Sequence, residues 1–210
     1  MSANTAIAAE HREDIMRAAI AEFGRVGYVA ASTNEIVKNA KVSKGLLFHY
    51  FTNKEKLYNA CQLHALEQYS QFMAEHITFT STDLFDRILE ALRVKMDFGC
   101  KNPEFLALTN RVRYIEDDDS LLKQPESDEY VMQMMQKYTS AFFDGVDTTQ
   151  FREGLDLAKV MDYTRLTMEA SWARFSHRHN NDTEAMVRDI NSYFAEAEEM
   201  LGLLKNGAYK

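Results

Sequence analysis

The sequence predicts an all-α protein, and both its composition and its periodicity support that expectation. Only two prolines and eight glycines occur in 210 residues, so long helices can form with few interruptions. Apolar side chains recur at helical spacing, as Ile15, Ala19 and Phe23 do, and no segment has the alternation of a half-buried strand. We expect an N-terminal domain of three helices, residues 1–54, joined by a long helix to a larger helical domain, residues 55–210.

Capping signals divide the N-terminal domain into short helices. The first helix should end near Gly27. Ser32 followed by Glu35 forms a capping box, in which each side chain accepts from a free backbone N–H group, and this pair predicts the start of a second helix. After a three-residue break, Ser43 should cap a third helix over residues 44–51.

The rest of the chain is expected to be helical as well. Thr52 and Glu55 repeat the capping-box spacing and predict a fourth helix over residues 54–77. Pro103 stands in the first turn of another expected helix, where its missing N–H group is not needed. The remaining predicted helices cover residues 82–100, 129–146, 155–179 and 183–205.

Charge is distributed unevenly along the chain. The formal net charge is −8, which by itself argues against a nucleic-acid partner. Residues 1–60 nevertheless carry eight Lys/Arg against six Asp/Glu, whereas the remaining residues carry sixteen against twenty-six. Five lysines lie between positions 38 and 56 with Glu55 as their single acidic neighbour. A small basic domain on an acidic body is typical of nucleic-acid binding through that domain.

Two short helices joined by a tight turn and preceded by a third form a helix-turn-helix pattern. The last helix would be the recognition helix. Leu47 and Phe51 lie four residues apart and should face a small core. A major groove about 12 Å wide admits one helix, and Gly45 would let the backbone approach it closely. The other faces of this helix would then carry Lys44, Gly45, Leu46, Phe48, His49 and Tyr50.

Base edges and phosphates call for different side chains. Lys44 can bind a guanine edge or a phosphate, and Leu46 or Phe48 can contact a thymine methyl group. The alternative for Leu46 and Phe48 is plain core packing. His49 and Tyr50 can donate to phosphate oxygens.

Two further positions suit phosphates. Thr33 lies at a helix start, where its hydroxyl and the free N–H groups together favour an anion, and Lys54 lies at the start of the fourth helix. The alternatives are that His49 is a surface histidine and that the lysines are simply solvated.

Residues 18–58, AAIAEFGRVGYVAASTNEIVKNAKVSKGLLFHYFTNKEKLY, resemble the DNA-binding domain of TetR-type transcriptional regulators. That family shows a Gly-aromatic pair ending the first helix, a Val-Ser-x-Gly turn, a recognition helix of the form Leu-Tyr-x-His/Tyr-Phe and a Lys-Glu-x-Leu helix start. The resemblance implies phosphate contacts from the positions of Thr33, Ser43, Phe48, Tyr50 and Lys54. It implies base-proximal positions for Lys44, Gly45, Leu46 and His49.

Three positions depart from the family pattern. Phe48 stands where the family usually has Tyr, so a phosphate hydrogen bond is lost there. Val37 replaces a common Ala. Lys41 replaces a common turn Gly, and if that turn requires a positive φ, Lys41 should cost some backbone strain.

The resemblance also implies that the larger domain binds a small molecule and forms a dimer. In the last predicted helix, apolar residues step by three and four, which suits helix packing within the chain, across a dimer, or both. The dimer seam would comprise Val187, Ile190, Phe194, Ala197, Leu201 and Leu204. Aromatic and methionine side chains suit a mostly apolar ligand pocket, with plain core as the alternative. The pocket candidates are Phe98, Phe105, Tyr114, Tyr138, Phe142, Tyr163, Met168 and Trp172.

We therefore expect a ligand-responsive transcriptional regulator, most simply a repressor. As a homodimer it would bind a palindromic double-stranded DNA operator, and a small, largely apolar effector would release it. The alternative is a helical partner-binding or scaffold protein without DNA binding.

Other classes find little support in the sequence. No phosphate loop, GxSxG or HExxH motif occurs, so we expect neither an enzyme nor a cofactor or metal site. Cys61 and Cys100 fit no metal or redox spacing. The chain has no apolar run of about 18 residues and no secretory signal, so we expect a cytoplasmic protein.

Overall fold

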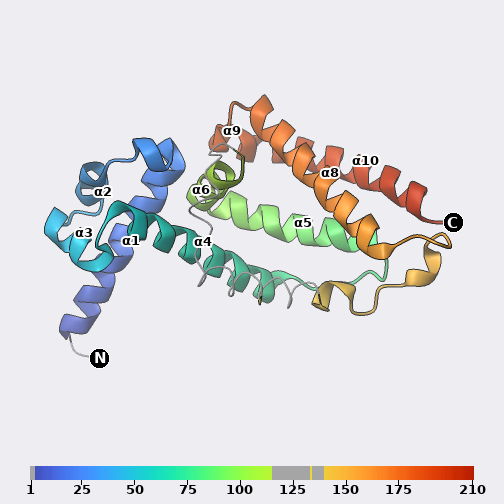
Figure 1. The fold of residues 1–210 in the computed structure, drawn as a ribbon, viewed down its shortest axis with the longest axis horizontal. Helices are drawn as coiled ribbons and strands as arrows, with labels where there is room; N and C mark the ends of the chain where they lie inside the picture. The colour runs from blue at the N-terminus through green and yellow to red at the C-terminus, as the bar shows by residue number, and fades with distance from the viewer. Residues whose placement is uncertain (1–2, 115–132, 134–139) are drawn as a thin grey trace. The chain divides into compact units, whose positions relative to one another are not determined.

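The computed structural model describes residues 3–114, 133 and 140–210 of the chain, without the side chains of residues 3–9 and 111–114 (Figure 1). Within these residues the protein is helical, and the one β feature is an isolated bridge between Phe151 and Tyr209. The predicted all-α class is confirmed. None of the described helices is both long enough and apolar enough to cross a lipid bilayer.

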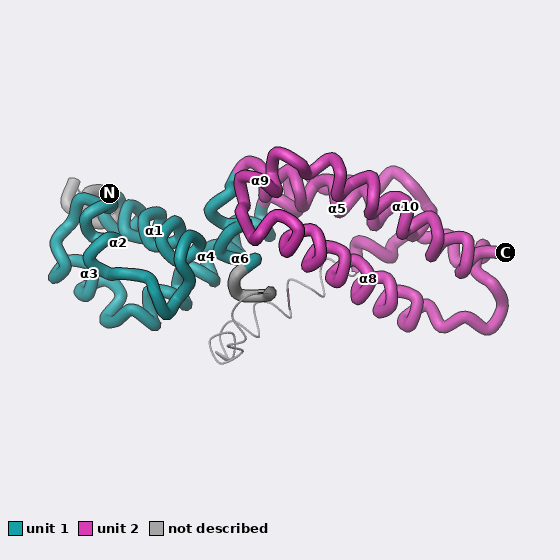
Figure 2. Tube along the Cα trace, turned by 90° about the horizontal axis from the view of Figure 1, so that it is seen from above, with its two compact units in different colours: residues 1–71, 102–129 teal, residues 72–101, 130–210 magenta. Residues whose placement is uncertain are grey.

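Two compact units make up the chain (Figure 2). Unit 1 comprises residues 1–71 and 102–129, and unit 2 comprises residues 72–101 and 130–210. The division falls inside the fourth helix, which agrees with the expectation that a long helix joins the two parts. It groups residues 102–114 with the N-terminal helices, and the functional boundary at residues 54/55 stays a prediction.

Unit 1 begins with four helices whose bounds follow the capping signals closely. They are α1 (Ala3–Ala30), α2 (Thr33–Asn39), α3 (Lys44–Phe51) and α4 (Lys54–His76). Gly27 has φ 80° and ψ 172°, a conformation open essentially only to glycine, and it interrupts α1 at the predicted end of the first helix.

The caps are only partly those predicted. Ser32 accepts a hydrogen bond from the Glu35 N–H group at 3.5 Å, as expected. The return half of the capping box is absent from the described contacts, because the Ser32 N–H group donates to the Glu22 carboxylate at 3.2 Å, while Glu35 pairs with Lys38 at 3.6 Å. The buried Glu22 of α1 therefore accepts the hydrogen bond from Ser32 that was predicted for Glu35.

The start of α4 also differs from the prediction. Asn53 caps this helix by accepting from the Lys56 N–H group at 2.8 Å. Thr52 has φ 62° and ψ −53°, and the Asn53 N–H group donates to the Phe51 carbonyl at 2.6 Å. Thr52 thus occupies the centre of a tight γ-turn, and the predicted Thr52–Glu55 capping box is wrong by one residue.

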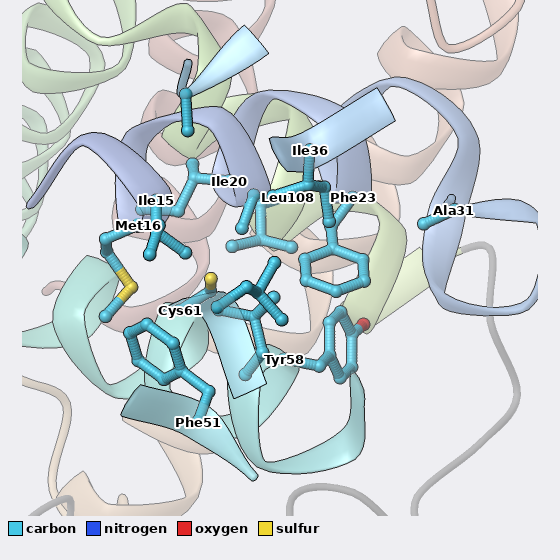
Figure 3. Close-up of a cluster of buried hydrophobic side chains, with 14 of the residues drawn as sticks. Ile15, Met16, Ile20, Phe23, Ala31, Ile36, Phe51, Tyr58, Cys61 and Leu108 are labelled. Atoms are coloured by element: carbon cyan, nitrogen blue, oxygen red, sulfur yellow. The ribbon is translucent and has the colours of Figure 1, made fainter. Parts of the chain in front are cut away.

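The core of unit 1 joins α1 to α4 and includes part of α6 (Pro103–Tyr114) (Figure 3). Phe23 and Tyr58 meet edge to face with ring centroids 4.8 Å apart. Leu108 of α6 is 1% exposed within the same cluster. A Cβ atom at Gly24 would lie 3.1 Å from the Cβ atom of Ala107 and 3.1 Å from the Glu104 carbonyl oxygen. Only a glycine lets α1 and α6 approach this closely.

Unit 2 contains α5 (Leu84–Lys101), α8 (Leu157–Arg178), α9 (Thr183–Arg188) and α10 (Ile190–Ala208), with a short 3-10 helix η1 (Thr148–Gln150). The single helix predicted over residues 183–205 is therefore wrong. Asp189 ends α9 and precedes α10, and its carboxylate and carbonyl both accept from the Ser192 hydroxyl. The helix predicted over residues 129–146 falls largely outside the described residues, of which residues 140–143 are helical.

Buried polar groups fix the loops of unit 2. Asp83 caps α5 by accepting from the Phe85 N–H group at 2.9 Å, one residue beyond the predicted helix start at residue 82. Arg87 is 6% exposed and donates to the carbonyl oxygens of Ser81 at 2.5 Å and Phe142 at 2.7 Å. These bonds satisfy a buried cation with backbone carbonyls and hold the segment that contains Phe142 against α5.

Candidate nucleic-acid interface

The helix α3, predicted to be the recognition helix, presents one face to the core and the opposite face to solvent. Leu47 is 0% exposed and Phe51 is 5% exposed, as the four-residue spacing predicts. Gly45 and His49, on the opposite side, are both exposed. Among the described residues, a Cβ atom at Gly45 would meet only the Ser43 hydroxyl, at 3.9 Å. Packing within the chain therefore does not require a glycine here.

The first turn of α3 is built by its cap. Ser43 lies in an extended conformation and its hydroxyl accepts from the Leu46 N–H group at 3.1 Å. That hydrogen bond leaves the hydroxyl proton of Ser43 available to donate to an anion. Lys44, the next residue, is exposed at the same helix end, so a cation and a hydroxyl donor stand side by side.

Lys44 meets a residue that the sequence did not single out. Its ammonium group donates to the Asn34 side-chain oxygen at 3.0 Å, and both residues are exposed. Asn34 belongs to α2, next to the predicted phosphate residue Thr33, which is half-buried as the first residue of that helix. No local sequence signal predicts a bond between residues ten positions apart.

The turn between α2 and α3 carries the expected strain. Lys41 adopts φ 55°, the left-handed conformation that a side chain disfavours, so the prediction for this replaced glycine is confirmed. Its side chain is exposed. Strain of this kind persists only where the surrounding structure imposes the turn, and here Val42 donates back to the Val37 carbonyl at 3.0 Å.

The larger side chains of α3 lie between the two faces. Leu46, Phe48 and Tyr50 are half-buried, and Phe48 and Tyr50 pack against the core of unit 1. Phe48 therefore contributes at least partly to the core, as the alternative interpretation held. His49 lies edge-on to the Tyr50 ring, with centroids 5.5 Å apart, so the two donors form one group.

Lys54, at the start of α4, is anchored within the unit. Its ammonium group donates to the Val29 carbonyl at 3.1 Å and lies 4.9 Å from the centroid of the Tyr28 ring. These contacts hold the end of α1 to the start of α4. They use one of three ammonium protons, so two remain for a phosphate.

Glu22 is a buried acid of α1 that holds the start of α2 in place. Its side chain is 4% exposed and pairs with Arg25 at 2.6 Å as well as with the Ser32 N–H group. Burial alone would raise the pKa of Glu22, but the hydrogen bonds from Arg25 and Ser32, with the charges of Arg25 and Lys54, lower that pKa below its ordinary value. The carboxylate thus stays charged and fixes the start of α2.

The predicted pocket residues do not gather at one place in the described structure. Phe105 packs against the core of unit 1, whereas Phe142 and Met168 join an apolar cluster of unit 2. Phe98 and Trp172 are buried. Tyr163 is 61% exposed on α8, which does not suit a residue lining a buried pocket. The side chains of Tyr114 and Tyr138 lie outside the described residues.

The predicted dimer seam faces inward at its centre. Ala197 and Leu201 are both 0% exposed within unit 2, so they pack inside the protomer. The other four positions are half-buried: Val187, Ile190, Phe194 and Leu204. The three-four spacing identified a helix-packing face correctly, but its centre is covered by the chain itself.

Three helices, the last with an open outer face, followed by a second helical unit, have the architecture of a helix-turn-helix protein. Residues 15–61 match the family of bacterial regulatory proteins, tetR family. The match falls on the helix-turn-helix segment, and the resemblance seen in the sequence is confirmed.

Known regulators agree with this assignment. The chain is 30% identical over 98 residues to the probable acrEF/envCD operon repressor of Escherichia coli K12, and the match covers 46% of this chain and 44% of that protein. It is 25% identical over 97 residues to the HTH-type transcriptional repressor NicS of Pseudomonas putida, covering 46% and 45%. The matched segments thus span less than half of these relatives.

Solved structures share the fold over nearly the whole chain. A TetR family transcriptional regulator from Chloroflexus aurantiacus superimposes with a TM-score of 0.64 at 18% identity, covering 96% of this chain and 94% of that one. The fatty acid degradation regulator FadR from Bacillus halodurans gives 0.61 at 16% identity, covering 87% and 97%. At these identities the likeness concerns the fold alone.

Proposed function

We propose that this protein is a transcriptional repressor that places α3 in the major groove of an operator. The observation that carries this proposal is the outward face of α3, where Gly45 and His49 are open and no internal packing among the described residues calls for the glycine. A glycine inside a helix costs about 0.8–1 kcal/mol relative to alanine. A glycine at this position would let the backbone of α3 approach DNA closely, which would explain why the cost is accepted.

Two kinds of contact would hold the helix there. Ser43, Thr33, Tyr50 and Lys54 surround α3 with hydroxyl and ammonium donors suited to phosphates. Lys44 and His49 lie where base edges are within reach. Phosphate contacts fix the register of the protein, whereas contacts to base edges select the sequence.

The repressor would bind as a homodimer through the outer faces of α8 and α10. Three large apolar side chains are exposed there: Tyr163 by 61%, Leu166 by 47% and Leu203 by 68%. Beside Leu203, a Cβ atom at Gly202 would meet nothing within 4 Å in the described chain, so a second helix could approach closely. We therefore propose that the dimer forms through this outer face and not through the seam predicted from the sequence.

The interface can be tested by sedimentation. Replacing Leu203 by Glu should convert a dimer to a monomer, because the charge would be buried on association. Ala195→Glu, at an exposed site on the same helix, shows whether any added charge suffices. A chain that is monomeric before substitution would overturn the dimer.

An effector bound in unit 2 would act through two helices. α4 runs unbroken from unit 1 into unit 2, and α6 follows α5 after a single residue, Asn102. Leu108 of α6 is itself part of the core of unit 1. A small, largely apolar effector that favours another arrangement of α4 and α6 would lower operator affinity by population shift. Effector titration at fixed salt tests this, and unchanged operator affinity would contradict it.

DNA binding is tested by a gel shift with the region upstream of the protein's own coding sequence. Lys44→Ala and His49→Ala should weaken specific binding, whereas Lys54→Ala should weaken binding to all duplexes alike. Glu10→Ala, at an exposed site on α1, serves as the control. Failure to bind any duplex at low salt would favour a helical partner-binding protein instead.

A further inference from the structure

The bond between Lys44 and Asn34 joins the two helices of the helix-turn-helix at its exposed side. The Lys44 ammonium group donates to the Asn34 side-chain oxygen at 3.0 Å. Glu35, beside Asn34, pairs instead with Lys38 at 3.6 Å. Lys44 is therefore ordered by a neutral amide and keeps its full charge for a partner outside the chain.

This pairing changes what each side chain can recognise. A free asparagine recognises adenine by accepting from N6 and donating to N7, which requires its oxygen. In this structure that oxygen already accepts from Lys44, which places a cation beside it. The amide nitrogen and the remaining ammonium protons are donors, and the positive charge beside the amide oxygen disfavours a further N–H donor there, so the pair favours an acceptor-rich base edge. Guanine, with O6 and N7 as adjacent acceptors in the major groove, is the base edge that matches.

We propose that Asn34 is a specificity-determining residue that positions Lys44 on a guanine in each half-site. The inference rests on the DNA binding proposed above and adds the base and a second residue to it. The flexible lysine stem loses less freedom on binding when Asn34 already holds it in place. Removal of Lys44 frees the Asn34 oxygen, and the preferred base at that position should then change from guanine to adenine.

The test is selection from a randomised duplex library, followed by affinity measurements on the enriched duplex. We expect the wild-type protein to enrich one guanine position per half-site that Lys44→Ala changes to adenine. Asn34→Ala should relax preference at that same position and weaken binding by about 5–10-fold, the lower part of the range for one bidentate base contact. The double variant Lys44→Ala, Asn34→Ala should lose less affinity than the product of the two single losses, because the two residues act as a unit.

Two matched variants separate positioning from folding. Asn34→Asp keeps the shape but pairs the ammonium group with a charge, so it should lower affinity at unchanged thermal stability. Asn39→Ala, at the exposed far end of α2, should leave the selected sequence unchanged.

The outcomes distinguish this inference from the proposed function. If wild type enriches a sequence but both Asn34 variants select it with equal affinity, or if the two single effects are additive at different bases, the inference is overturned and DNA binding stands. If wild type enriches no sequence, the proposed function fails and the inference with it.

Discussion

Gly24 and Gly45 lie in the same helix-turn-helix unit, yet the structure gives them opposite surroundings. At Gly24 a Cβ atom would stand 3.1 Å from Ala107 and from the Glu104 carbonyl oxygen. At Gly45 the nearest described atom would be the Ser43 hydroxyl, 3.9 Å away. The fold of the chain explains the first glycine. Packing among the described residues does not explain the second, for which we propose an external partner.

The same contrast separates the two faces of α3. Inward-facing residues contribute to the stability of the fold, whereas outward-facing residues are proposed to contribute to DNA binding. Substitutions at inner positions should therefore lower the melting temperature, while substitutions at outer positions should leave it unchanged or raise it and act on DNA affinity alone.

The largest effect is expected at an inner position of α3. Leu47→Ala removes a side chain that is 0% exposed and leaves a cavity, so it should lower the free energy of unfolding by about 2–5 kcal/mol. Chemical denaturation measures this, with the exposed His49→Ala as the matched outer variant. A loss below about 1 kcal/mol at Leu47 would show that this face is not the core.

Gly24→Ala should come next. The added methyl group overpacks the contact between α1 and α6, which should cost about 1–3 kcal/mol. Thermal melting compares this variant with Gly24→Ala, Ala107→Gly. The second change removes one clash but leaves the Glu104 carbonyl, so rescue should be partial. An unchanged melting temperature for Gly24→Ala would refute close packing here.

Glu22→Gln tests how much the buried Glu22 carboxylate contributes to stability and how that contribution changes with pH. Because folding lowers the pKa of Glu22, its charged form stabilises the native state above the ordinary value of 4.5, and this contribution is lost as pH falls through the lower, folded pKa. The variant should lose about 1–2 kcal/mol at pH 7 and less near pH 3. Glu13→Gln is the control, since Glu13 is 74% exposed and its pair with Arg17 at 3.6 Å should contribute little. A deficit that grows toward low pH would contradict this assignment.

Gly45→Ala has the smallest effect on stability and the opposite sign. It should raise the free energy of unfolding by about 0.5–1 kcal/mol, because alanine favours the helix and its methyl group meets only the Ser43 hydroxyl, at van der Waals distance. Differential scanning calorimetry gives the stability, and the gel shift on the same preparation gives the affinity, which should fall. Destabilisation by this change would show that internal packing requires a glycine at position 45, as it does at Gly24.

The sequence predicts local features of this protein well because caps and periodicity are local. Ser43 fixes the start of α3, and its bounds agree with the prediction to the residue. The Leu47–Phe51 spacing gives the inner face correctly. The break at Asp189 went unpredicted because the apolar periodicity continues through it from α9 into α10.

Partners distant in sequence could not be predicted in the same way. Glu22 takes the place of Glu35 at Ser32 across a turn, and Asn34 meets Lys44 across another. Helical spacing gives Ala197 a packing face but does not say whether the chain or a second copy covers it. Tyr163 was assigned to a pocket by residue type alone, which carries no information about its 61% exposure.

The central claim is that the outer face of α3 lies within a DNA groove, and Gly45→Leu tests it most directly. Fluorescence anisotropy with the duplex enriched by the wild-type protein measures affinity, and circular dichroism measures folding on the same samples. We expect at least a 100-fold loss of affinity, with helix content and melting temperature at least equal to wild type, because the leucine side chain would hold the helix off the bases. Wild-type affinity in the folded variant would contradict the account.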